Sequence, residues 1–78
     1  MALKELVATI ARALVDDPEG VDVAEVDGDR SAVLELRVGD GDIGKVIGKD
    51  GRTAQSIRTI LLAATTKLGR RVHLDIVD

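Results

Sequence analysis

The stretch VIGKDGRTAQSI, residues 46–57, places a short polar segment between two apolar patterns. The segment is Gly48-Lys49-Asp50-Gly51, and the residues after it have helical spacing. On a structural interpretation, Gly48 ends one helix in the left-handed conformation and Asp50 caps the next. On a functional interpretation, the glycines let an outside backbone approach, and the first amides of the second helix attract an anion. The four residues alone leave both interpretations open.

The neighbouring residues favour a site for a sugar-phosphate chain, because Lys45, Lys49 and Arg52 surround the glycine pair. The whole chain carries a net charge of −3, but its charges are divided unevenly. Residues 1–42 hold 4 Lys or Arg and 11 Asp or Glu, whereas residues 43–78 hold 7 and 3. A basic face in the second half is compatible with a polyanionic partner, although solvated surface charge is the simpler interpretation.

The first half of the sequence predicts a helix and two strands. Apolar residues recur at helical spacing through residues 3–14, and a proline and glycine soon afterwards end the helix. Two strand-like segments follow, residues 21–26 and 32–38, with a hairpin signal at residues 27–29. The first strand changes its alternation midway, which is compatible with a β-bulge. The helical stripe comprises Leu3, Leu6, Val7, Ile10, Ala11 and Leu14.

The second half predicts two helices and a final strand. Asp42 is expected to cap a short helix, and a longer helix is predicted over residues 52–68, with Gly69 ending it. Residues 71–77 alternate as a strand. The predicted fold class is therefore α+β, with the order α-β-β-α-α-β and helices packed on one face of a three-stranded sheet. The apolar stripe of the long helix comprises Ala54, Ile57, Leu61, Ala64 and Leu68, with Ile60 beside them.

Length and composition limit the class of protein. The 78 residues suffice for one domain, which we expect to span residues 1–78. The chain has no cysteine and a single histidine, His73, so neither a disulfide framework nor a multi-histidine metal site is expected. Glu5 and Arg12 interrupt the first apolar run, which is therefore not a signal peptide. No apolar run approaches the ~18 residues of a membrane span, and we expect a cytoplasmic protein without membrane contact.

Two nucleotide-binding patterns fail on their chemistry. The segment GDGDIG, residues 39–44, matches the dinucleotide fingerprint formally, but its aspartates would face a pyrophosphate. The same segment begins a P-loop, but Val46 stands where a serine or threonine must meet magnesium. Ser31 and Ser56 lack the base and orienting acid of an activated nucleophile. We therefore expect a protein that is not an enzyme, with no cofactor and no metal.

The segment IGKVIGKDGRTAQSIRTIL, residues 43–61, resembles the core of a KH domain. In that family a GXXG loop joins two helices and holds about four single-stranded nucleotides by their backbone. The element order resembles the type II, prokaryotic arrangement over residues 3–77. A free-standing domain of this size with GRTAQSIR after the loop is similar to the small bacterial KhpA-type RNA-binding proteins. The resemblance implies that the second and third strands are parallel, so that the sheet is mixed.

The resemblance also implies a groove between the last two helices and the last strand. It assigns the clamp to residues 48–51, with small and apolar residues before it that let bases approach and polar residues after it near the RNA backbone. Asp50 is expected to point away from phosphate and to cap the long helix. Arg70, Arg71 and His73 are looser candidates. The RNA-binding candidates are Ile43, Gly44, Lys45, Val46, Ile47, Gly48, Lys49, Asp50, Gly51, Arg52 and Ser56.

These residues predict a protein that binds single-stranded RNA. Because the chain has no aromatic residue, one clamp without base stacking should bind weakly and with strong salt dependence. The family resemblance implies a bacterial RNA chaperone or post-transcriptional regulator that gains affinity as a homodimer or beside another KH-domain protein. The alternative is a protein-interaction or dimerisation module whose GXXG segment is only a structural turn.

Overall fold

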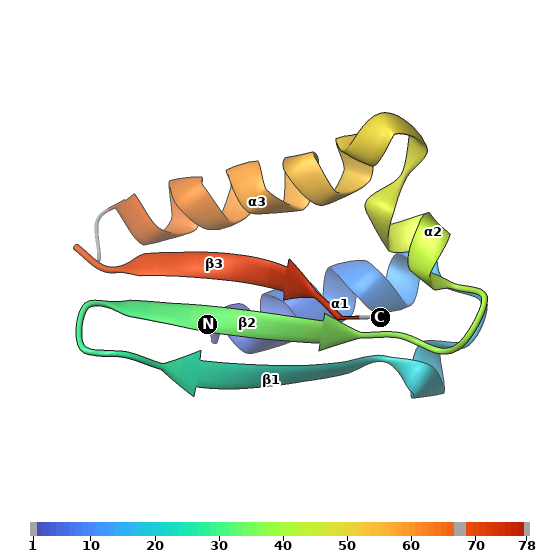
Figure 1. The fold of residues 1–78 in the computed structure, drawn as a ribbon, viewed down its shortest axis with the longest axis horizontal. Coiled ribbons are helices and arrows are strands. Elements are labelled where there is room, and N and C mark those ends of the chain that lie inside the picture. The colour runs from blue at the N-terminus through green and yellow to red at the C-terminus, as the bar shows by residue number, and fades with distance from the viewer. Residues whose placement is uncertain (1, 67–68, 78) are drawn as a thin grey trace.

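The structure is a computed structural model that describes residues 2–66 and 69–77 (Figure 1). The predicted α+β class and the order α-β-β-α-α-β are confirmed. Two 3₁₀ turns, Pro18–Gly20 and Lys49–Gly51, precede the first strand and the last helix. The regular elements are α1 (Leu3–Leu14), β1 (Asp22–Asp27), β2 (Ser31–Arg37), α2 (Ile43–Ile47), α3 (Arg52–Thr65) and β3 (Arg71–Ile76).

The sheet has the order β1-β2-β3, with β1 antiparallel and β3 parallel to β2. The mixed sheet is therefore confirmed. The pairing of β1 with β2 runs without interruption from Asp22 opposite Arg37 to Asp27 opposite Ala32, so the suggested bulge is wrong. The apolar alternation of β1 changes midway because Val26 is not a core residue. It lies on the opposite face of β1 from the buried Val23 and is 52% exposed.

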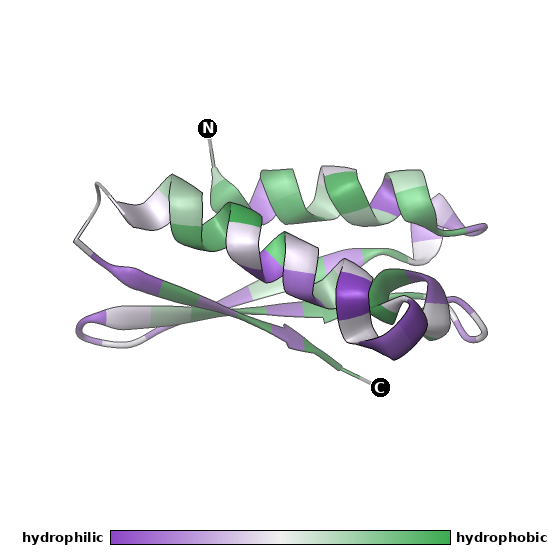
Figure 2. Cartoon of the chain, turned by 90° about the horizontal axis from the view of Figure 1, so that it is seen from above, coloured by the Kyte–Doolittle hydropathy of each residue, from purple (hydrophilic) through white to green (hydrophobic). Residues whose placement is uncertain are grey.

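The hydrophobic core lies between the sheet and the helices. Figure 2 shows α1 and α3 on the same side of the sheet. Leu34 and Leu36 of β2 are buried beneath them, as the alternation predicted. On α1, Val7 and Ala11 of the predicted stripe are fully buried, but Leu14 is 38% exposed and Ala8, which the stripe omitted, is buried. Because the core is aliphatic throughout, close packing of branched side chains must hold α2 and α3 over the sheet.

The buried face of α3 differs in part from the predicted stripe. Ala54, Ile57 and Leu61 are buried as expected, but Ala64 is exposed and Thr65 occupies the buried position. The Thr65 hydroxyl donates a hydrogen bond to the carbonyl of Leu61 at 2.9 Å, so its polar atom is satisfied within the helix. Ile60 is 44% exposed, and Leu68, where the helix was expected to end, lies outside the described residues. No helix among the described residues is long and apolar enough to cross a membrane.

Candidate nucleic-acid interface

The turn between α2 and α3, residues 48–51, is called here the clamp turn, and its backbone is unusual. Gly48 has φ 77° and ψ 171°, a combination that essentially only glycine adopts. A Cβ atom at Gly48 would overlap the Thr53 hydroxyl and lie 2.8 Å from the Thr53 amide nitrogen. Asp50 and Gly51 also have positive φ, 58° and 75°. The turn is closed by a hydrogen bond from the Gly51 amide to the Gly48 carbonyl at 3.1 Å.

The clamp turn does not contain the predicted helix cap. Asp50 adopts a left-handed backbone, Gly51 occupies the N-cap position of α3, and no side chain caps that helix. The expected capping role of Asp50 is therefore wrong, because Gly51 separates Asp50 from the first helical residue. The start of a 14-residue helix is left without a side-chain acceptor, and the positive end of its dipole favours an anion there.

The side chains beside the clamp turn divide into exposed and buried groups. Lys49, Asp50, Arg52 and Ser56 are exposed, and the Ser56 hydroxyl donates to the Arg52 carbonyl at 2.9 Å. On α2, Gly44 is exposed, and no atom within 4 Å would meet a Cβ there, so the backbone is open to an outside molecule. The helix α2 ends and α3 begins at this turn, which lies at one edge of the molecule (Figure 1).

The apolar residues of α2 do not all reach the surface. Val46 is fully buried and belongs to the core, so it supports α2 from beneath. Ile43 is half-buried, and Ile47 is 37% exposed. Contact between bases and aliphatic side chains on α2 would therefore fall to Ile43 and Ile47 rather than to all three residues.

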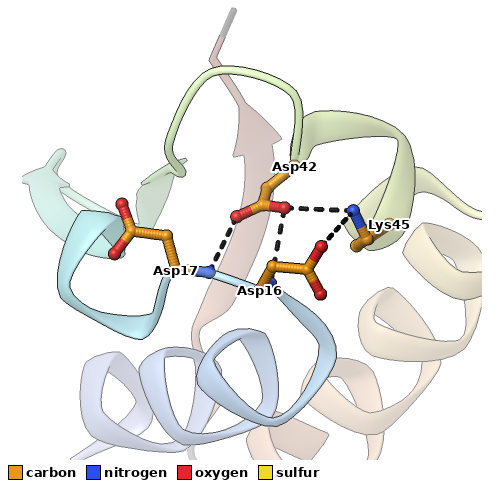
Figure 3. Close-up of polar contacts among 4 residues, drawn as sticks. All are labelled: Asp16, Asp17, Asp42 and Lys45. Atoms are coloured by element: carbon orange, nitrogen blue, oxygen red, sulfur yellow. Dashed lines mark hydrogen bonds and ion pairs between the residues drawn. The ribbon is translucent and has the colours of Figure 1, made fainter.

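Lys45 does not join Lys49 and Arg52 in one free basic cluster. Its ammonium nitrogen lies 3.1 Å from a carboxylate oxygen of Asp16 and 3.2 Å from one of Asp42 (Figure 3). These hydrogen bonds, first with Asp16 and then with Asp42, raise the pKa of Lys45 above its ordinary value of 10.5. The charge of Lys45 is therefore largely balanced within the protein.

Asp42 has a structural role that the sequence did not predict. Its carboxylate makes no cap on α2, but it accepts hydrogen bonds from the amides of Asp17 at 3.0 Å and Asp16 at 3.4 Å (Figure 3). Asp42 is only 4% exposed. Burial alone would raise the pKa of Asp42, but the Asp17 amide, the Lys45 ammonium and the Asp16 amide outweigh it and hold the pKa below 3.8. The contact ties the end of α1 to the start of α2.

The looser candidates Arg70, Arg71 and His73 line a hollow at the opposite end of α3 from the clamp turn. A hollow of about 690 Å³ lies between the end of α3, the start of β3 and the β1–β2 hairpin. We call it the basic hollow. Arg70 is also paired with Asp27, its guanidinium nitrogen 2.7 Å from the carboxylate. Neither Arg30 nor Arg58 was expected from the sequence, since the chain pattern gives no sign that they meet β3. The basic hollow is lined by His73 and by four arginines, Arg30, Arg58, Arg70 and Arg71.

In the part of the chain that the structure describes, no three acidic or histidine side chains lie together in a group that could hold a metal ion. The polar residues near the clamp turn are cations, one carboxylate and a hydroxyl bonded to its own helix. These groups can bind an anionic backbone, and their arrangement offers no pair of a nucleophile and a base among the described residues.

The chain matches a family model described as KhpA/KhpB, KH domain, over residues 4–76. It is 53% identical over 73 residues to the RNA-binding protein KhpA of Caldanaerobacter subterraneus subsp. tengcongensis, with 94% of this chain and 97% of the relative covered. It is 54% identical over 76 residues to RNA-binding protein KhpA of Halalkalibacterium halodurans, covering 97% and 100%. It is 51% identical over 75 residues to RNA-binding protein KhpA of Clostridium acetobutylicum, with 96% of this chain and 100% of the relative covered.

Among solved structures, the chain is similar to an Era variant from Aquifex aeolicus bound to GDP and aluminium fluoride. The TM-score is 0.60 with 22% identity, and the match covers 95% of this chain and 29% of the Era chain. At this identity the similarity supports the fold alone. The match shows that the arrangement of helices and sheet in this chain also occurs as part of a longer protein.

Proposed function

The chain belongs to the KhpA/KhpB KH-domain family, and from this premise we propose that it binds single-stranded RNA through the clamp turn. The observation that carries the proposal is the backbone of residues 48–51. Three of its residues have positive φ, and Gly48 packs so closely on Thr53 that a side chain would not fit. A turn that exposes main chain in front of an uncapped helix is suited to hold phosphates by its amides.

In this proposal the RNA backbone crosses the clamp turn, and its bases lie against α2. Lys49 and Arg52 supply the positive charge, because Lys45 is already balanced by Asp16 and Asp42. Gly44 leaves room for a base, and Ile47 offers an aliphatic contact. The chain has no Phe, Trp or Tyr, so bases gain no stacking on aromatic rings. Affinity for one tetranucleotide should therefore be weak and fall steeply with salt.

The wider role follows from the family rather than from the geometry. We propose that residues 1–78 work as one KH domain in the cytoplasm, as an RNA chaperone or post-transcriptional regulator. A second copy of the chain, or another KH-domain protein, would supply a second clamp on the same RNA. Two weak contacts joined in this way bind far more tightly than either alone.

Charge reversal at the clamp turn tests the proposal. Lys49→Asp should weaken binding to a short single-stranded RNA, measured by fluorescence anisotropy, at least about tenfold. Lys4→Asp is the matched control, since it makes the same charge change on the exposed surface of α1. Far-UV circular dichroism verifies that both variants fold. Equal affinities for the two variants would favour the alternative, a protein-interaction module in which residues 48–51 are only a turn.

A further inference from the structure

The helix α2 leads into the clamp turn, but it is too short to hold its own position. It has five residues, and an isolated helix of fewer than about 12 residues is marginal in water. No side chain caps α2 or the start of α3. The fully buried Val46 anchors α2 from beneath. Because one buried side chain leaves a short helix free to pivot, a second attachment is needed to fix its direction.

That second attachment is a group of polar contacts between α2 and the end of α1, which we call the clasp. The Asp42 carboxylate accepts hydrogen bonds from the amides of Asp17 and Asp16 and, at 3.2 Å, from the Lys45 ammonium (Figure 3). The Lys45 ammonium also meets the Asp16 carboxylate. Among the described residues, no buried side-chain nitrogen or oxygen lacks a partner. The clasp comprises Asp42, Lys45, Asp16 and the amide of Asp17.

The two loops that carry the clasp also pack closely through their backbones. A Cβ atom at Gly20 would lie 3.0 Å from the Gly39 amide nitrogen, and one at Gly39 would lie 3.2 Å from a carboxylate oxygen of Asp17. The Asp42 amide donates a hydrogen bond to the Gly39 carbonyl at 3.0 Å. The chain therefore enters α2 from a loop that is held against the loop following α1.

The clasp and the clamp turn lie at the two ends of α2. Asp42 precedes the first residue of α2, and Gly48, which opens the clamp turn, follows the last. The Gly48 amide donates a hydrogen bond to the Gly44 carbonyl at 2.9 Å, so the turn continues directly from the helix. Five helical residues span only about 7.5 Å. A shift of α2 at the clasp should therefore displace the clamp turn.

We propose that the clasp is a positioning device for the RNA site: Asp42 and Lys45 hold α2, and through it the clamp turn, in the conformation that binds RNA. The proposal rests on the proposed function, in which RNA crosses the clamp turn. Asp42 does not contact RNA in this role, since its carboxylate is buried and bonded within the protein. Lys45, one of the predicted RNA-binding residues, acts through α2 rather than through a phosphate.

The direction of one affinity change tests the proposal. Asp42→Asn removes a negative charge near a site for a polyanion, so electrostatics alone would raise the affinity for RNA. Asparagine keeps the shape of the side chain but accepts hydrogen bonds at one atom only, so part of the clasp loses its acceptor. The affinity for a short single-stranded RNA, measured by fluorescence anisotropy, should therefore fall at least about threefold. Asp40→Asn makes the same charge change at an exposed position of the same loop and should bind no more weakly than the wild type.

Lys45 supplies a second, milder variant, which leaves Asp42 bonded to both amides. Lys45→Gln should lower the affinity without changing its salt dependence, whereas the loss of a phosphate contact would reduce the slope of log affinity against log salt by about 0.7. Lys45→Arg keeps a cation between the two carboxylates and should bind nearly as well as the wild type. Because both residues act through one contact, Asp42→Asn with Lys45→Gln should weaken binding by less than the product of the two single effects.

Amide hydrogen exchange separates a shift of α2 from a general loss of stability. In Asp42→Asn, the amides of Gly48 and Gly51, which both donate hydrogen bonds within the protein, should lose more protection than the amides of β2. Val7→Ala is the matched control, since it truncates a fully buried side chain outside the clasp. It should lower stability but keep the wild-type affinity at a temperature where circular dichroism shows both proteins to be folded.

The outcomes separate this proposal from the function on which it rests. If Lys49→Asp leaves RNA binding intact, the clamp is wrong and the role of the clasp is wrong with it. If binding depends on Lys49 but Asp42→Asn binds as well as Asp40→Asn, only the clasp proposal is overturned. It is also overturned if Val7→Ala loses as much affinity as Asp42→Asn, or if protection at Gly48 falls no further than in β2.

Discussion

The two ends of α3 both carry basic side chains nearby, but they are built in different ways. At the clamp end, a glycine-rich turn presents backbone, and the nearby Lys45 is balanced by Asp16 and Asp42. At the far end, arginine side chains from three segments surround a hollow, and only Arg70 among those described is paired with a carboxylate. One end depends on backbone conformation, and the other depends on side-chain charge.

This difference predicts which amino-acid substitutions each end of α3 tolerates. A backbone site is sensitive to the loss of a glycine, even when no charge changes. A side-chain site is sensitive to the loss of charge, even when the backbone does not move. The following predictions examine that contrast, beginning with the helix that both ends share.

The largest expected effect is on the middle of α3, which holds both ends in place. Leu61 is 1% exposed, so Leu61→Ala should leave a cavity and lower the free energy of unfolding by roughly 2 to 5 kcal/mol. Leu62→Ala is the control, because Leu62 is 68% exposed and its truncation should cost about 0.5 kcal/mol or less. Urea unfolding followed by circular dichroism measures both. Similar losses for the two variants would mean that the buried face of α3 is assigned incorrectly.

The next effect concerns the backbone of the clamp turn. Gly48→Ala places a Cβ atom in a backbone conformation that only glycine adopts, which should lower the free energy of unfolding by roughly 1 to 3 kcal/mol. The new Cβ atom would also clash with Thr53, which adds to this loss. Gly51 also has a positive φ of 75°, but no atom lies within 4 Å of the position where a Cβ would be. Gly51→Ala should therefore lower the free energy of unfolding by roughly 1 to 2 kcal/mol. Thermal unfolding of the two variants shows which substitution destabilises the protein more. A greater loss at Gly51 would contradict the described packing of Gly48 on Thr53.

A smaller effect separates the two lysines near the clamp. Lys49→Gln should reduce the salt dependence of RNA binding by about 0.7 in the slope of log affinity against log salt, the contribution of one phosphate contact. Lys45→Gln should leave that slope nearly unchanged, since Lys45 is engaged with Asp16 and Asp42. The loss of the Lys45 charge should lower the free energy of unfolding by at most about 1 kcal/mol, because Lys45 and Asp16 are exposed and the buried Asp42 keeps its hydrogen bonds from the amides of Asp16 and Asp17. Equal slopes for both variants would show that Lys45 also meets the RNA.

The smallest effect is a dependence of stability on pH. The pKa of Asp42 lies below 3.8 in the folded chain, so its carboxylate favours folding above that pH. The contribution is lost as the pH falls through the lowered pKa. Asp42→Asn should therefore melt below the wild type at neutral pH, and the gap should narrow in acid. Asp40→Asn, at an exposed neighbouring position, is the control. A gap that stays constant down to strong acid would contradict the role given to the Asp42 carboxylate.

Much of the fold follows from short-range patterns. Helical spacing predicted α1, and alternation predicted β2 and β3. The patterns failed where they depended on the surroundings of an element. Ala64 and Thr65 lie side by side on α3, and helical spacing alone favoured the apolar residue for the buried face. The hydroxyl of Thr65 finds its partner in the Leu61 carbonyl, so burial of the polar residue costs little.

The candidate site shows the same division. The glycines of the clamp turn were predicted, because a conformation that excludes side chains leaves its mark on adjacent residues. Asp42 occupies the N-cap position of α2 as expected, but its carboxylate does not cap that helix, because it has partners elsewhere in the chain. The cap expected from Asp50 was wrong, since Gly51 occupies the N-cap position of α3. Asp42 bonds to amides 25 and 26 residues away, and no periodic pattern connects those positions.

The sequence by itself determined the element order, the aliphatic core and the glycine turn, since each depends on residues that are close together in the chain. Tertiary structure alone decided which charges remain available. It placed Lys45 between two carboxylates, and by pairing β3 parallel to β2 it brought Arg71 beside Arg30. The physical reason is that the state of a charge depends on its neighbours in space, and only folding brings distant residues together.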